Sequence, residues 1–186
     1  MYNPMAINPA YAGSRGVISI FGLYRTQWVG LDGAPETNSF SINTPIGKHV
    51  GGGLSFLNDK VGPKVESVIT ADLSYTIQTS ENYKLSFGIK GTLNLFDLDP
   101  TKLNSKDFND VVLQNIDNYL SPNIGAGLYY YSEKLYLGTS VSNFFQNNSY
   151  DFKSVTINKE RMDLYIIGGY IVDLAPNLKF KPAFMT

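Results

Sequence analysis

The side chains that could do chemistry are few and widely separated. His49 is the only histidine in 186 residues, and it follows Lys48 at the boundary between a turn and a strand. A Ser-His-Asp triad or a zinc site needs further groups at a defined geometry, and no motif in the sequence supplies them. The chain has no cysteine, so disulfides and thiolate ligands are excluded. We therefore expect no enzyme active site, no cofactor and no metal.

A second candidate for chemistry is a group of aspartates between residues 97 and 118. Carboxylates bind calcium when they lie in a loop with a glycine at its sixth position and a glutamate at its twelfth. The spacing here does not match that pattern, and a solvated acidic loop explains these residues better. The aspartates are Asp97, Asp99, Asp107, Asp110 and Asp117.

The elements that position these side chains are indicated best by residues 64–96. Apolar and polar residues alternate with period two along 64–78 and again along 83–96, with exceptions at Ser67 and Val68. Only a β-strand places alternate residues on opposite faces. The polar break at 79–82 is short enough for a hairpin turn. We predict a long antiparallel hairpin with one apolar and one polar face.

Charged side chains fall on the polar face of the predicted strands. We expect them to pair across strands inside a lumen and to hold a barrel or a plug in place. They are Arg25, Glu66, Asp72, Lys84 and Lys90. The three glycines at 51–53 lack the frame of a phosphate-binding loop, so they indicate a bend or a close approach of backbone.

The same alternation predicts nine strands, at 17–29, 37–46, 50–58, 64–78, 83–96, 119–132, 134–143, 162–174 and from 178 onward. Short links at 79–82, 132–133 and 175–177 alternate with wider ones at 30–36, 59–63, about 97–118 and about 144–160. Residues 17–186 therefore form the strand region. Residues 1–16 form an irregular N-terminal segment with two Asn-Pro pairs, and we expect it to pack on other residues.

Strand length and composition favour an all-β fold, an antiparallel up-and-down transmembrane β-barrel of the outer-membrane type. A membrane strand needs about 9 to 11 residues, whereas soluble strands usually stop at about 5 to 6. Only 17% of the residues are charged, against about 25% in a soluble domain. The alternative is a soluble β-sandwich or lipocalin-like barrel, in which the apolar face would lie inside.

Aromatic residues near the strand ends would form the girdle of such a barrel. They are Tyr24, Trp28, Tyr75, Tyr83, Tyr119, Tyr131 and Tyr170. The formal net charge of -1 provides no basic surface for nucleic acid. The first residues do not resemble a signal peptide, and the last residues end within a strand pattern. We therefore expect the chain to be an incomplete part of a larger barrel.

Four short motifs follow one another along the chain. They are Asn3-Pro4-Met5-Ala6-Ile7-Asn8-Pro9-Ala10-Tyr11-Ala12-Gly13, Tyr24-Arg25-Thr26-Gln27-Trp28, Gly33-Ala34-Pro35 and Asn58-Asp59-Lys60-Val61-Gly62-Pro63. In this order they resemble the PorP/SprF family of Bacteroidetes membrane proteins. The residues that we carry forward as the family motif are Asn3, Pro4, Asn8, Pro9, Ala10, Tyr11, Ala12, Gly13, Arg25, Gln27, Trp28, Gly33, Pro35, Gly62 and Pro63.

The resemblance implies a non-enzymatic outer-membrane barrel of the type IX secretion and gliding machinery. Such a barrel would dock or retain a secreted surface protein, such as a gliding adhesin with a type B C-terminal signal. Its partners would be that protein, other type IX secretion components and outer-membrane lipid. The family brings no catalytic residues. Two alternatives stay open: a passive outer-membrane porin, and an outer-membrane hydrolase that would depend on His49.

Overall fold

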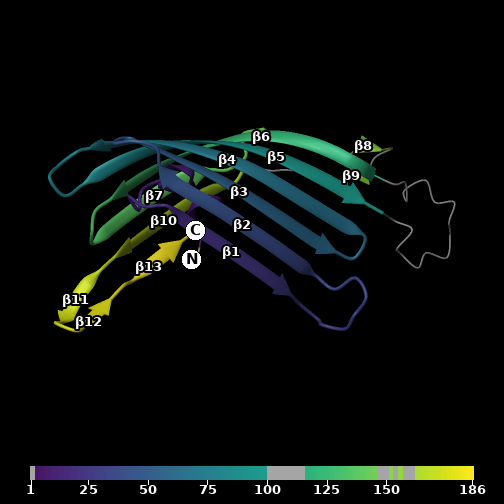
Figure 1. The fold of residues 1–186 in the computed structure, drawn as a ribbon, viewed down its shortest axis with the longest axis horizontal. Coiled ribbons are helices and arrows are strands. Elements are labelled where there is room, and N and C mark those ends of the chain that lie inside the picture. The colour runs from purple at the N-terminus through teal and green to yellow at the C-terminus, as the bar shows by residue number, and fades with distance from the viewer. Residues whose placement is uncertain (1–2, 100–115, 146–150, 153–154, 157–161) are drawn as a thin grey trace.

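The computed structural model describes residues 3–99, 116–145, 151–152, 155–156 and 162–186. Its main element is a nine-stranded antiparallel sheet (Figure 1). The strands, in sheet order, are β1 (Ser19–Thr26), β2 (Glu36–Pro45), β3 (Val50–Val61), β4 (Lys64–Gln78), β5 (Lys84–Leu98), β6 (Ile116–Tyr131), β7 (Leu135–Val141), β10 (Leu164–Tyr170) and β13 (Ala183–Met185). Two short pairs stand apart from the sheet: β8 (Asp151–Phe152) with β9 (Val155–Thr156), and β11 (Val172–Ala175) with β12 (Leu178–Phe180).

The central hairpin of β4 and β5 confirms the prediction made from period-two alternation. Each strand contains 15 residues, and the two pair from Lys64 opposite Leu98 to Gln78 opposite Lys84. β3 and β6 continue the ladder on either side. Strands of this length exceed the usual length in soluble proteins and are long enough to cross a bilayer at a tilt.

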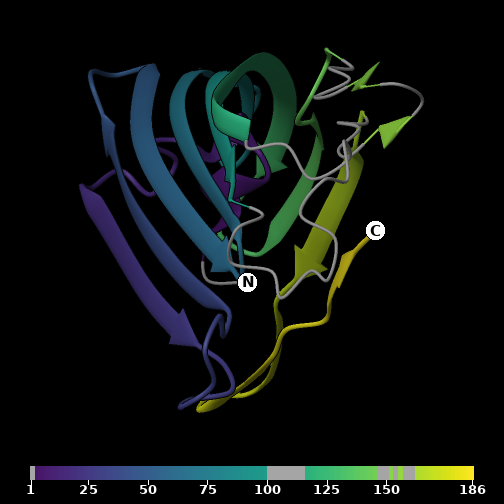
Figure 2. The same ribbon diagram turned by 90° about the vertical axis from the view of Figure 1, so that its right-hand side faces the viewer.

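The two faces of the sheet differ in curvature and in chemistry. The sheet curves around the N-terminal segment, which lies inside the curve (Figure 2). On this concave face the buried polar residues are Ser41, Asn43, Thr70, Asp72, Ser74, Ser86, Lys90, Ser121, Asn123 and Ser140. On the convex face the exposed apolar residues include Ile20, Phe40, Leu54, Ile69, Leu73, Phe87, Ile89, Ile124, Leu128 and Leu137. This arrangement is the reverse of a soluble sandwich, whose apolar face is buried.

The wider links differ from their predicted boundaries. The link predicted at 59–63 is a two-residue turn, because β3 continues to Val61 and β4 begins at Lys64. Gly62 has a φ of 57°, a conformation that favours glycine and lets the chain reverse here. The loop predicted at 97–118 is shorter, since Asp97 belongs to β5 and residues 116–118 to β6. Residues 100–115 and most of 144–160 lie outside the described residues.

The strand predicted at 162–174 is divided in two. β10 ends at Tyr170, whereas β11 pairs with β12 and not with the main sheet. The backbone N–H of Ile171 donates to the carbonyl oxygen of Lys134 at 2.7 Å, and Lys134 forms a salt bridge of 2.6 Å with Asp173. These contacts tie the β11–β12 hairpin to the turn between β6 and β7. The hydrogen bond lowers the pKa of the Asp173 carboxyl and raises the pKa of the Lys134 ammonium.

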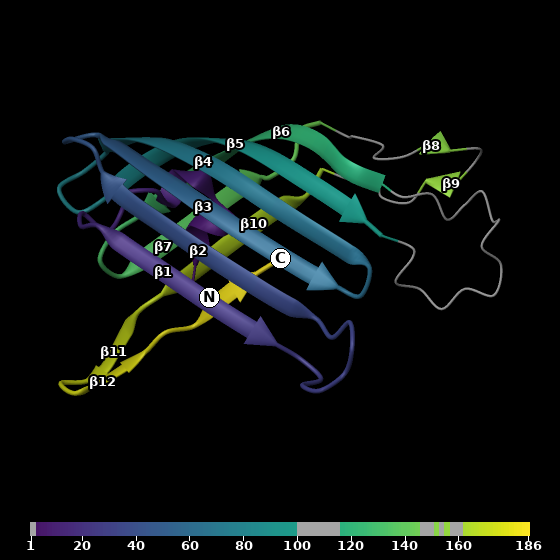
Figure 3. The same cartoon turned by 45° about the vertical axis from the view of Figure 1, so that its right-hand side comes forward.

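The nine-stranded sheet is open, with β1 and β13 as its two edges (Figure 3). Every neighbouring pair in the sheet is antiparallel, so strands at the first and ninth positions run in the same direction. The described strands therefore form an open antiparallel sheet and not a closed barrel. In the described part of the chain, no helix has the length and apolarity needed to cross a membrane.

Candidate functional site

The N-terminal segment forms two short 3-10 helices, η1 (Pro4–Ala6) and η2 (Pro9–Tyr11). A proline stands at the start of each, where its missing N–H would have no intrahelical partner anyway. Asn8 caps η2, because its side-chain Oδ1 accepts the backbone N–H of Ala10 at 3.0 Å. Both Asn8 and Ala10 are fully buried. The first motif thus lies packed against the concave face.

Polar contacts from β6 and β7 hold one side of this segment. The Asn8 Nδ2 donates to the carbonyl oxygen of Leu128 at 2.9 Å and to that of Thr139 at 3.4 Å. The Ser140 Oγ donates to the carbonyl oxygen of Ile7 at 2.9 Å. Asn8 therefore satisfies its own helix and two strands at once, which explains why a buried amide is placed here.

Contacts from β4 and β5 hold the other side. The Ser74 Oγ donates to the carbonyl oxygen of Ala12 at 2.6 Å, and the Lys90 Nζ donates to that of Ala6 at 2.7 Å. Asp72 lies directly opposite Lys90 in the ladder and is 3% exposed. Neither carboxylate oxygen of Asp72 has a hydrogen-bond partner among the described residues. Lys90 thus holds the N-terminal segment, as predicted for a plug.

Glycines in the strands allow the segment to approach the sheet. A Cβ at Gly88 would overlap the backbone of Pro9 and Ala10, and a Cβ at Gly53 would overlap the Met5 sulfur. The close approach of backbone predicted from the triple-glycine run is confirmed at Gly51, where a Cβ would overlap the carbonyl group of Ala12. A side chain at Gly51 or Gly88 would therefore displace the N-terminal segment.

The remaining members of the first motif also contact the sheet. The Asn3 Nδ2 donates to the Ser41 Oγ at 3.0 Å. Gly13 has a φ of 70° and lies against the backbone of Gly51 and Pro45. Together with the contacts above, these bonds connect the segment to five strands, β2, β4, β5, β6 and β7.

The charged residues of the concave face make different pairs from those predicted. The ionic partner of Glu66 is Lys64 on the same strand, at 2.7 Å, because residues two apart share a face. The Asn94 Nδ2 also donates to Glu66, at 2.8 Å. Among the described residues, the predicted ion pairs across strands are not formed. Arg25 lies beside the side chain of Gln27.

The other three motifs meet at the end of the sheet that carries the β1–β2 loop. The backbone N–H of Gln27 donates to Pro35 at 3.0 Å, and that of Gly62 donates to Gly33 at 2.9 Å. Trp28 has a positive φ of 52° and is 69% exposed. The loop and the β3–β4 turn are therefore bonded to each other.

Pro63 extends this network, since its carbonyl oxygen accepts the backbone N–H of Asp99 at 3.1 Å. The predicted motif residues consequently fall into two groups. One is the N-terminal segment on the concave face, and the other is the bonded loop and turn at one end of the sheet. Sequence spacing gave no sign of this division, because both groups depend on strand pairing.

Tyr11 of the N-terminal segment and three tyrosines of the sheet, Tyr129, Tyr131 and Tyr136, form a tyrosine row. The ring of Tyr129 stacks on Tyr131 at a centroid distance of 4.8 Å and makes an edge-to-face contact with Tyr11 at 5.5 Å. Tyr136 lies 6.4 Å from Tyr129. The prediction that Tyr131 belongs to the outer girdle is wrong, because it shares the concave face with Tyr129 two residues earlier. A cavity of about 670 Å³, lined in part by Ile167, adjoins this tyrosine row.

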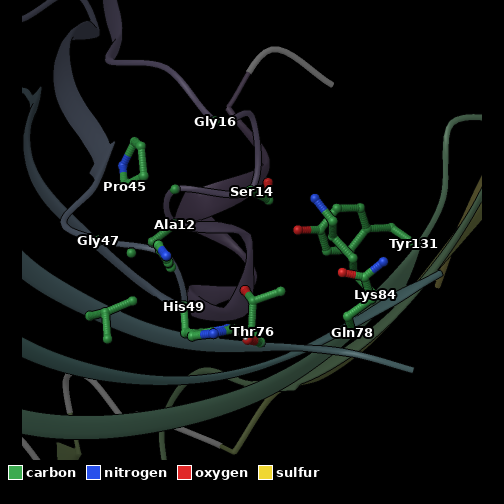
Figure 4. A pocket seen from close by; sticks show the side chains of 14 residues that line it. Ala12, Ser14, Gly16, Pro45, Gly47, His49, Thr76, Gln78, Lys84 and Tyr131 are labelled. Carbon is green, nitrogen blue, oxygen red and sulfur yellow. Dashed lines mark hydrogen bonds between the residues drawn. The ribbon is translucent and has the colours of Figure 1, made fainter. Parts of the chain in front are cut away.

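His49 lies in a second cavity, at the end of the sheet that carries the β2–β3 and β4–β5 turns. The His49 Nδ1 is 3.0 Å from the carbonyl oxygen of Thr76. In Figure 4, His49 and Thr76 lie on one side of this cavity, and Gln78, Lys84 and Tyr131 line the other. The histidine therefore binds backbone and is not part of a catalytic triad.

No group of three or more His, Cys, Asp and Glu side chains among the described residues could hold a metal. Asp107 and Asp110 of the predicted acidic loop lie outside the described residues, and Asp97 is part of β5. The site is thus a packed N-terminal segment flanked by two cavities.

The distribution of side chains defines the class of protein. A wide sheet with an exposed apolar convex face and a buried polar concave face is typical of membrane β-proteins, because soluble monomers rarely expose continuous apolar surface. The profile of the type IX secretion system membrane protein PorP/SprF matches residues 1–186. The chain belongs to this family, whose members are secretion-system membrane proteins and not enzymes. No curated protein and no solved structure matches it.

Proposed function

We propose that this chain is part of a closed outer-membrane barrel that retains a secreted surface protein, such as a gliding adhesin with a type B C-terminal signal. Family membership supports a role in type IX secretion. The observation that best supports a membrane barrel is the exposed apolar convex face around a buried polar concave face. A closed barrel has no free edges, so the partner contacts its loops, its ends or its lumen.

Strand direction supports a larger barrel. β1 and β13 run the same way, so antiparallel closure needs an odd number of additional strands. Open edges are also costly in lipid, because no water satisfies their backbone N–H and C=O groups. The argument from strand direction agrees with the even strand number of bacterial single-chain barrels.

The two ends of the sheet have different roles in this proposal. The short turns at 79–82 and 132–133 and the β11–β12 hairpin, whose turn is the predicted link at 175–177, face the periplasm. The wider links at about 97–118 and 144–160 face outward and are the candidate docking loops. The N-terminal segment is the third candidate, and it would act inside the lumen, where it is held by five strands.

The test is retention of the adhesin on whole cells, measured with an antibody against its exposed part. A strain that lacks this protein should lose the surface signal of the adhesin. If the deletion strain keeps that signal, the proposal is contradicted. The docking loop is tested by deleting residues 100–115, which leaves β5 and β6 intact. We expect at least a tenfold loss at unchanged membrane level of the barrel. Unchanged retention would exclude this loop as the dock.

A passive porin is the second candidate, because two cavities of about 340 and 670 Å³ lie on the concave face. The N-terminal segment packed across that face favours the docking function instead. Purified protein in a planar bilayer separates them: a steady ion conductance without any partner supports the porin, and a blocked barrel supports docking.

A further inference from the structure

The cavity that contains His49 has a distinct chemistry. It has a volume of about 340 Å³ and lies between residues 12–16 of the N-terminal segment and the ends of β4, β5 and β6. Its ionisable lining residues are Lys48, His49, Lys84 and Tyr131. None of its lining residues, all within the described chain, carries a carboxylate. The charged lining residues are thus lysines with no carboxylate beside them, and such a cavity, called here the cationic cavity, attracts anions.

The histidine is oriented for this role. Because a carbonyl oxygen can only accept, the His49 Nδ1 carries the hydrogen that it donates to Thr76 at 3.0 Å. The Nε2 is the nitrogen left for a ligand, and it donates to a carboxylate only in the imidazolium form, because the Nε2 of a neutral ring protonated at Nδ1 is an acceptor. The His49 ring also lies 5.9 Å from that of Tyr75. The lysines then add two charge-assisted donors to the cavity.

The position of the cavity on the sheet indicates that its anion comes from an exported chain and not from lipid. The cavity opens on the concave face, where Lys84 pairs across the ladder with Tyr131. Lipid around the barrel contacts the convex face, so its phosphate groups do not reach the cavity. The periplasmic end, where this cavity lies in the proposed orientation, is where an exported chain would enter.

The tyrosine row adjoins the cationic cavity and favours an organic ligand over an inorganic anion. Tyr131 lines the cationic cavity and stacks on Tyr129, which lines the larger cavity together with Tyr11 and Tyr136. Aromatic faces contribute apolar contact area. An inorganic anion would use only the cationic cavity, whereas a peptide would use both.

We propose that the cationic cavity binds a carboxylate of an exported peptide, while the tyrosine row contacts an apolar side chain of the same peptide. The source of the peptide rests on the proposed function. The binding site itself rests on the cavity, its charge and its continuity with the tyrosine row.

The test uses the purified full chain in detergent and a short fluorescent peptide with several glutamates and one phenylalanine. Binding is measured by anisotropy, beside the same peptide with glutamines in place of glutamates. The variant with Lys48→Gln and Lys84→Gln should bind the acidic peptide at least about tenfold more weakly. Both lysines are exposed, so the fold is retained.

Two matched variants control for charge. Lys60→Gln removes an exposed lysine on β3 outside the cavity and should leave binding unchanged. Replacing Lys48 and Lys84 by arginine should preserve binding. Equal binding of both peptides, or no loss in the double glutamine variant, would overturn the proposal. Displacement by inorganic phosphate at the concentration of the peptide would overturn the peptide assignment.

This assay is independent of adhesin retention. A protein that binds the acidic peptide but does not retain the adhesin refutes the proposed function and leaves the binding site in place. A protein that retains the adhesin with no peptide binding refutes the binding site alone.

Discussion

Replacement of Asn8 by alanine should loosen the N-terminal segment from the sheet. The change removes the cap of η2, which costs about 1 kcal/mol. It also removes the hydrogen bonds to Leu128 at 2.9 Å and Thr139 at 3.4 Å, which together contribute about 1 kcal/mol net. The free energy of lifting the segment should therefore fall by about 2 kcal/mol, which raises the lifted population about 30-fold.

A single engineered thiol reports that population. The chain has no cysteine, and Ser74, 4% exposed, lies under the segment with its Oγ 2.6 Å from the carbonyl oxygen of Ala12. In a Ser74→Cys background, a maleimide reaches the thiol only when the segment lifts. Its labelling rate should rise about 30-fold in Asn8→Ala and by an intermediate factor in Asn8→Ser, which keeps a capping oxygen.

The control is Asn82→Ala in the exposed β4–β5 turn, which should change the labelling rate by less than about twofold because surface changes have small effects. A similar rate in Asn8→Ala and the control, with the sheet intact by circular dichroism, would refute the reasoning. It would mean that the buried amide does not hold the segment in place.

Two further results are expected from the same contacts. Gly88→Ala forces a Cβ into the backbone of Pro9 and should accelerate the labelling of the Ser74→Cys thiol at least about fivefold, since overpacking costs about 1 to 3 kcal/mol. The control Gly91→Ala, whose Cβ meets nothing within 4 Å, should leave the labelling rate unchanged. Equal rates in the two variants would contradict the close fit of the segment at Gly88. Asp173→Asn should speed hydrogen exchange at Ile171, because it removes the salt bridge to Lys134. The pKa of Asp173 is lowered from 3.8 and that of Lys134 is raised from 10.5. The salt bridge therefore stabilises the β11–β12 hairpin between these values, and this stabilisation is lost as the pH falls below 3.8 or rises above 10.5. Protection at Ile171, corrected for intrinsic exchange, that does not fall at any pH below 3.8 while the sheet stays folded would refute it.

Much of the sheet follows from local sequence. The hairpin of β4 and β5 is predictable because alternation is set by neighbouring residues, and it places Asp72 and Lys90 on one face without any knowledge of the fold. Its turn is equally local. The boundary near residue 60 was missed because Asp59 and Lys60 resemble loop residues, whereas in the sheet Asp59 pairs with Thr37 and accepts its hydroxyl hydrogen bond at 2.5 Å.

The site was less predictable. The first motif was recognised by resemblance, but its position depends on Ser140 and Thr139, which lie 133 and 131 positions from their partners Ile7 and Asn8. The one local signal was glycine in the strands, which indicated close approach without showing what approaches. The position of Tyr131 near a strand end predicts the girdle, although its spacing of two from Tyr129 is the better guide to its face.

Most of the strands, their two faces and the resemblance to the family follow from the sequence alone, because period-two alternation and short motifs are properties of neighbouring residues. Three features emerge only in the tertiary structure: the N-terminal segment fills the concave face, Lys90 binds its carbonyl oxygens, and Lys48, His49 and Lys84 line one cavity. These relations come from pairing strands far apart in the chain, and curvature of the sheet then brings their side chains to a common space.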